Sequence, residues 1–222
     1  MTTQAGTAAG WRKMAMQALI GAIAGASGTV AVTSLMEQQD GLDWTPSQII
    51  LVGIGVIYAL MGLFVGLGTL APRLFGQRML NVADADEIVE ERSGMGSSAL
   101  SCLILGAALM LLAYAVAAEA ADVAALVTPA TAYGILLVVL TGFVGVSIWM
   151  WRSFDELWRQ LTVDVSAITG NVLMLVAIIW GGAAATGLTY GPHPLDLVSL
   201  AFGSMLLACF VAAGRRGMMT SQ

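Results

Sequence analysis

The chain has 222 residues, of which 58% are hydrophobic and only 10% are charged. Soluble globular domains carry about 25% charged residues, so this composition excludes an ordinary soluble protein. The formal net charge is −5, and the basic residues form no patch with interleaved aromatic side chains. Both features argue against nucleic-acid binding.

Long apolar runs predict membrane-spanning α-helices. Each run is about as long as the roughly 20 residues that cross a bilayer as a helix. Backbone polar groups in lipid must be satisfied within the segment, and the short alternating segments of a β-barrel are not seen. We therefore predict an all-α bundle of six spans in three hairpins within residues 11–217, between a flexible N-terminal tail (1–10) and a C-terminal tail (218–222). The spans are at about 14–35, 47–70, 98–118, 130–150, 165–188 and 195–213.

Proline marks the start of the second helix in each predicted pair. Thr45-Pro46 and Thr128-Pro129 suit helix starts, because proline is tolerated in the first helical turn. Pro194 precedes the last span in the same way, and His193 beside it is interpreted as a solvated turn residue. The first span has too long an apolar run for a signal peptide, so we expect it to be retained.

The loop from Arg73 to Ser98 is the longest charged segment of the chain. Part of it has a helical pattern, with acidic residues on one side. A carboxylate cluster of this kind can hold a hard cation, but a solvated helix is the simpler interpretation. If a partner docks from the cytoplasm, we expect it at Asp84, Asp86, Glu87, Glu90, Glu91 and Arg92.

The second long loop, Arg152 to Asp164, is amphipathic. Its apolar and aromatic residues resemble those of a helix that lies in the membrane interface. Asp164 is then expected to cap the N-terminus of the fifth span, which begins at Val165.

Small residues recur within the predicted spans. Such residues let helix backbones approach closely. Close packing matters in lipid because the hydrophobic effect does not drive helices together there. Packing inside the bundle is the simplest interpretation, and docking of a partner helix or a lipid tail is the alternative. The candidates for helix packing are Gly21, Gly25, Gly28, Gly62, Gly66, Ser97, Ser101, Gly142 and Gly145.

Asn171 is the most polar side chain within the predicted spans. It is interpreted as an interhelical hydrogen-bonding residue, with a ligand contact shared with Thr169 and Ser166 as the alternative. We predict no cofactor, metal or catalytic residue. A bis-histidine haem needs two histidines and the chain has only His193, while a retinal Schiff base needs a lysine within a span and Lys13 lies at a membrane edge.

The basic residues predict the orientation of the chain. All nine lie on one side of the predicted spans, and the opposite loops hold only acidic residues. Cytoplasmic loops carry the excess of lysine and arginine in membrane proteins. We therefore expect a multi-pass protein of the bacterial inner (cytoplasmic) membrane, with both termini and both long loops in the cytoplasm.

Four short segments carry a resemblance to a group of bacterial membrane proteins. They are LNVADADEIVEER (residues 80–92), the triplet DEL (155–157), the turn GPHPLD (191–196) and the closing GRRG (214–217). Together they resemble an uncharacterised group of six-helix integral membrane proteins. The resemblance implies a topology and no assigned activity.

Two functions are favoured by this pattern, ahead of an enzyme that would use carboxylates such as Asp84 or Glu87. The first is a non-enzymatic accessory or scaffold subunit, which associates with a membrane-protein partner, or with further copies of itself, through small-residue helix faces. The alternative is a transporter of small solutes or lipids that uses polar groups near Asn171. The small-residue faces and the lack of ionisable groups in the spans favour the first.

The predicted orientation can be tested with a membrane-impermeant thiol reagent on intact cells. In a chain with Cys102 and Cys209 replaced by serine, a cysteine at Asp40 is expected to be labelled and one at Asp86 to be protected. The reason is that the bilayer separates these two loops. Labelling at Asp86 with none at Asp40 would reverse the orientation.

Overall fold

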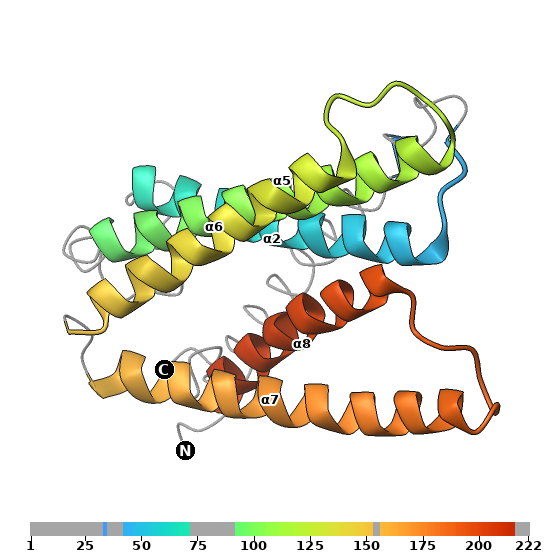
Figure 1. Cartoon of the computed structure of the whole chain (residues 1–222). Coiled ribbons are helices and arrows are strands. Elements are labelled where there is room, and N and C mark those ends of the chain that lie inside the picture. The colour runs from blue at the N-terminus through green and yellow to red at the C-terminus, as the bar shows by residue number, and fades with distance from the viewer. Residues whose placement is uncertain (1–32, 35–41, 72–91, 153–155, 216–222) are drawn as a thin grey trace, which may run out of the picture.

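A computed structural model describes residues 33–34, 42–71, 92–152 and 156–215. All regular structure in these ranges is helical (Figure 1). The helices are α2 (Pro46–Leu70), α5 (Arg92–Ala120), α6 (Pro129–Met150), α7 (Glu156–Ala185) and α8 (Pro194–Arg215). All five are long and apolar enough to cross a membrane, which confirms the all-α transmembrane class for this part of the chain. The first predicted span lies almost wholly outside the described residues, so the six-span count and the three hairpins stay predictions.

Three of these helices begin at a proline. Pro46, Pro129 and Pro194 are the first residues of α2, α6 and α8, as the sequence predicts. In each case a side-chain hydrogen bond joins the capping residue before the proline to the third helical residue. The bonds run from Thr45 N to Gln48 Oε1 (2.8 Å), from Thr131 N to Thr128 Oγ1 (3.2 Å) and from His193 N to Asp196 Oδ2 (2.7 Å). These bonds satisfy backbone groups that the helix itself leaves open, so His193 is a capping residue.

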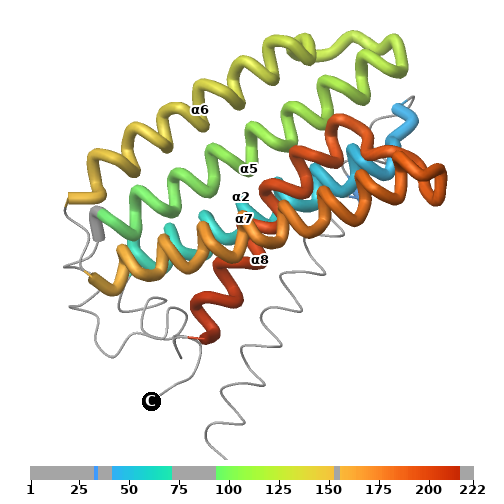
Figure 2. Tube along the Cα trace, turned by 60° about the horizontal axis from the view of Figure 1, so that its bottom comes forward, coloured from blue at the N-terminus to red at the C-terminus, as the bar shows by residue number. Residues whose placement is uncertain are grey.

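The helices contact one another in the order α6, α5, α2, α8 and α7 (Figures 1 and 2). The α2–α5 contact is the most extensive. The largest fully buried side chains, Leu51 and Leu109, come from these two helices. At the two ends of the series burial falls away, since α6 buries only Ala132 and Leu136 and α7 buries no residue.

Glycine allows α2 and α5 to approach at backbone distance. A Cβ atom added at Gly62 would lie 2.6 Å from the carbonyl oxygen of Ala99, and one added at Gly55 would lie 2.8 Å from that of Gly106. A Cβ added at Gly106 would in turn meet the carbonyl oxygen of Gly55. No side chain fits in these gaps, so the close approach depends on glycine at these positions.

The other small residues predicted for packing are placed differently. Gly66 has room for a Cβ, which would lie 3.7 Å from that of Ala99. Ser97 and Ser101 are half-buried in α5. Gly142 and Gly145 are exposed on α6, with no described atom within 4 Å of an added Cβ. Gly21, Gly25 and Gly28 lie outside the described residues.

Tyr58 joins the α7–α8 pair to the rest of the structure. Its hydroxyl group donates a hydrogen bond of 3.1 Å to the backbone oxygen of Phe202 in α8. The two rings also meet edge to face, with centroids 6.2 Å apart. An edge-to-face pair adds about 0.5–1.5 kcal/mol beyond the buried area. The contact of α2 with α8 therefore combines a polar and an aromatic interaction at one residue.

The helix that contains the fifth predicted span begins before Val165, and the expected helix cap at Asp164 is wrong. The structure has one continuous helix from Glu156 to Ala185, and Asp164 lies within it rather than at its cap. No glycine or proline interrupts residues 156–165. Polar side chains there bond within their own helix, as Gln160 Nε2 does to Glu156 Oε1 at 2.8 Å. The 30 residues of α7 span about 45 Å, which exceeds a hydrocarbon core of about 30 Å. The polar first turns therefore extend beyond the core.

The close approach of α2 and α5 predicts opposite effects for two glycine-to-alanine changes in one helix. Gly62→Ala should lower the free energy of unfolding by about 1–3 kcal/mol, because the new Cβ clashes with backbone. Gly53→Ala is the matched control, since an added Cβ there meets no described atom within 4 Å. It should raise stability by up to about 1 kcal/mol through helix propensity. Unfolding in detergent measures both, and equal effects would contradict the packing of Gly62.

Candidate functional site

α7 carries the polar residues that the sequence singles out within a span. Asn171 is exposed, and its Nδ2 donates a hydrogen bond of 2.8 Å to the backbone oxygen of Ala167. This residue lies about 9 Å along the helix from Val165, within the apolar part of α7. The amide oxygen of Asn171 accepts no hydrogen bond from any described residue.

Thr169 and Ser166 do not join Asn171 in one site. The Thr169 hydroxyl oxygen is buried and has no hydrogen-bond partner among the described residues, whereas Ser166 is exposed. At about 100° per residue, Asn171 lies some 160° around the helix from Thr169 and some 140° from Ser166. The structure therefore places Asn171 on a different face of α7 from Thr169 and Ser166.

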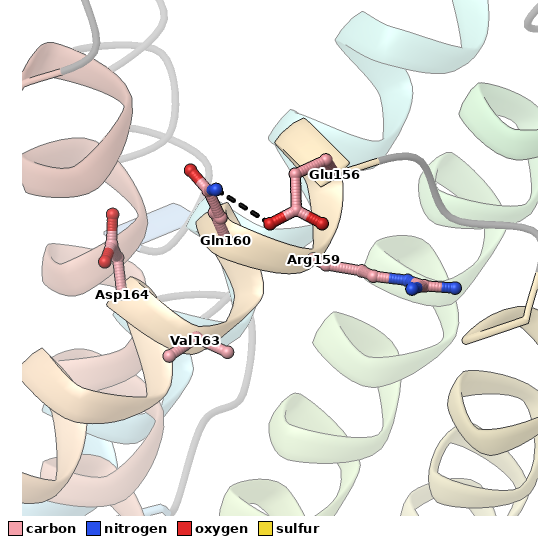
Figure 3. A pocket seen from close by; sticks show the side chains of 5 residues that line it. All are labelled: Glu156, Arg159, Gln160, Val163 and Asp164. Carbon is pink, nitrogen blue, oxygen red and sulfur yellow. Dashed lines mark hydrogen bonds between the residues drawn. The ribbon is translucent and has the colours of Figure 1, made fainter.

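A hollow of about 310 Å³ lies at the polar beginning of α7 (Figure 3). It is lined by Glu156, Arg159, Gln160, Val163 and Asp164. Figure 3 shows Gln160 turned toward Glu156, while Arg159 extends to the side opposite Asp164. The Arg159 Nη2 atom donates to the backbone oxygen of Trp151 at 3.3 Å. Two of the five residues, Glu156 and Asp164, carry carboxylates, and none is a serine, threonine, cysteine, histidine or lysine.

A second hollow, of about 470 Å³, lies beside the segment between α5 and α6. Glu119, Asp122 and Thr128 line it together with apolar residues between Val123 and Pro129. Asp122 has a positive φ of 55° and ends α5. Val123 N bonds to Ala118 O at 2.9 Å and Asp122 N to Glu119 O at 3.2 Å, which is the Schellman pattern of a helix C-terminus. The position of Asp122 is thus explained by helix termination.

The predicted cytoplasmic docking segment is not described by the structure. Asp84, Asp86, Glu87, Glu90 and Glu91 lie outside the described ranges, and Arg92 is the first residue of α5. Within those ranges no group of three or more His, Cys, Asp or Glu side chains is placed to hold a metal ion.

Sequence reasoning missed two residues that shape the bundle. Gly55 and Gly106 face each other across the α2–α5 contact, yet neither is part of the predicted packing set. A signal for Gly55 was present, because it lies seven residues before Gly62 and therefore on nearly the same helix face. Gly106 is surrounded by alanines and leucines, and no second glycine at helical spacing marks it as a packing residue.

Comparison of the chain with protein-family models, with curated proteins and with solved structures finds no match. The resemblance to six-helix bacterial membrane proteins therefore stays a prediction. Within the ranges that it describes, the structure defines five helices that are candidate membrane spans, with polar groups at separate places along them.

The buried Thr169 hydroxyl predicts an unusual response to mutation. Thr169→Val should leave the free energy of unfolding unchanged or raise it by up to about 1 kcal/mol, because it removes a buried polar group without a partner. Thr69→Val is the matched control, since the Thr69 hydroxyl donates to Gly66 O at 2.8 Å. It should cost about 0.5–1.5 kcal/mol. A comparable loss for Thr169→Val in thermal unfolding would reveal a partner, such as water or a ligand.

Proposed function

We propose that the protein is a non-enzymatic accessory or scaffold subunit that holds partner membrane proteins through the free faces of its helices. The observation that carries this proposal is the uneven burial along the helix series. α2 and α5 pack closely, whereas α6 and α7 bury almost nothing within the described part of the chain. The end helices thus offer most of their surface to lipid or to a partner.

The outer surface of α6 supports docking of another helix. Gly142 and Gly145 are exposed, and no described atom lies within 4 Å of a Cβ added at either position. Glycine offers lipid less contact area than a larger apolar residue would. It does, however, let a second backbone come close, and packing at that distance is a main source of helix association in membranes. This surface is therefore suited to a partner helix.

The place of the protein in the cell follows from its charges. The basic residues lie on one side of the six predicted spans, so we propose that the protein belongs to the bacterial inner membrane with both termini in the cytoplasm. The acidic segment from Asp84 to Arg92 is then a cytoplasmic site for the same partner.

A transporter of small solutes or lipids is the alternative function. It would use Asn171, Thr169 and Ser166 as polar contacts. Their separation around α7 weighs against one binding site formed by these three residues. The accessory-subunit proposal is preferred for this reason.

The proposed function can be tested by purification in a mild detergent followed by mass determination. The chain is expected to co-purify with a second membrane protein. The double change Gly142→Leu and Gly145→Leu should lower recovery of that partner roughly tenfold, equivalent to about 1.4 kcal/mol of lost packing. Because space around both glycines is open, the chain's own stability should not change.

Val144→Leu is the control, since Val144 is exposed on another face of α6. It should leave recovery of the partner unchanged. A chain that purifies with lipid and detergent alone, before any substitution, would overturn the proposed function.

A further inference from the structure

Asn171 lies on the side of α7 that packs against no described helix. Residues at intervals of three and four share a helix face, and on this side Ala167, Asn171, Met174 and Ile178 are all exposed. The opposite side, with Thr169, Leu173 and Val176, is half-buried, and α8 is the helix that α7 contacts most. The amide therefore points out of the described bundle within the apolar length of the helix.

The hydrogen-bonding capacity of Asn171 is only partly used. Exposed threonines in these helices satisfy their hydroxyl groups on their own helix, as Thr141 does with Leu137 O at 2.9 Å and Thr162 with Trp158 O at 2.8 Å. Asn171 bonds Ala167 O in the same way, but its amide keeps a second N–H and an oxygen acceptor. In hydrocarbon an unsatisfied polar group of this kind is costly, so the side chain requires a partner.

A second copy of the same residue supplies the complementary groups. A carboxamide is both donor and acceptor, with opposite partial charges at its two ends, so two of them form reciprocal hydrogen bonds. Copies of one membrane protein insert in the same orientation, and a two-fold axis along the membrane normal brings identical residues together at one depth. From Val165 to Ala185 the helix carries no charged residue, so like charges do not oppose this contact.

We propose that α7 is the self-association surface of this protein and that paired Asn171 side chains form the centre of a two-fold dimer. This inference rests on the proposed function, since it assumes that the chain works by helix association. The inference goes beyond the proposed function because it assigns the α7 surface to a second copy of the chain. The α6 surface remains the site for a different protein.

Disulfide cross-linking in membranes tests the proposal. In a chain with Cys102→Ser and Cys209→Ser, the variant Met174→Cys places a thiol one turn from Asn171 on the same side. Ile179→Cys is the matched control, because Met174 and Ile179 are 60% and 61% exposed but lie about 140° apart around the helix. Mild oxidation is expected to give a covalent dimer at Met174→Cys and little at Ile179→Cys.

The amide itself is tested in the same background. Asn171→Leu should weaken dimerisation about 3- to 30-fold, which corresponds to the 0.6–2 kcal/mol of an interhelical hydrogen bond in membranes. Asn171→Gln keeps the amide and should restore part of the dimer. The association constant is measured from the dilution of labelled protein in lipid vesicles.

Three results would overturn the proposal. They are equal cross-linking at the two positions, a monomer at every protein-to-lipid ratio, and capture of a different protein by Met174→Cys. The outcome is separate from that of the proposed function. Loss of the dimer with the α6 partner still bound would remove only this inference, and a dimer without any co-purifying protein would remove the accessory-subunit role.

Discussion

The close approach of α2 and α5 is the contact on which the other helix positions depend. Lipid removes the hydrophobic drive between helices, so van der Waals packing at short range has to hold them together. Gly62 against Ala99 and Gly55 against Gly106 allow that range. α6 packs on α5, and α8 is held on α2 by Tyr58 and Phe202. α7 in turn packs on α8, so each outer helix is positioned through this central pair.

This arrangement concentrates packing in the middle and leaves free surface at the ends. Among the described helices, the two at the ends of this series each have one extensive helix contact. α6 and α7 occupy those positions, and their exposed side chains include Val138, Ile148 and Ile178. Most of this surface is suited to lipid. The exposed glycines of α6 are poorly suited to lipid, because they offer it little contact area. The amide of Asn171 is also poorly suited to lipid, because it needs a hydrogen-bond partner. The proposed association with other chains would account for both features.

The sequence predicted the helices better than it predicted their contacts. Helix starts at Pro46, Pro129 and Pro194 were predicted because proline and capping residues act within one turn of the chain. The start of α7 was placed nine residues too late, since a polar stretch was interpreted as a boundary although nothing in it interrupts a helix. The packing glycines were only partly identified. Gly62 lies in the α2–α5 contact, whereas a Cβ added at Gly142 or Gly145 would meet no atom of another described helix within 4 Å.

By itself the amino-acid sequence determined the membrane class of the protein, the approximate length of the described spans and the start of three of them. These properties depend on local apolar length and on capping chemistry. Tertiary structure alone decided which glycines lie against the backbone of a neighbouring helix and that Tyr58 contacts Phe202. It also decided that Asn171 faces outward while the Thr169 hydroxyl is buried. The physical reason is that a membrane helix is apolar on every side, so hydropathy does not indicate which side faces the bundle. Only the packing of one helix against another makes that choice.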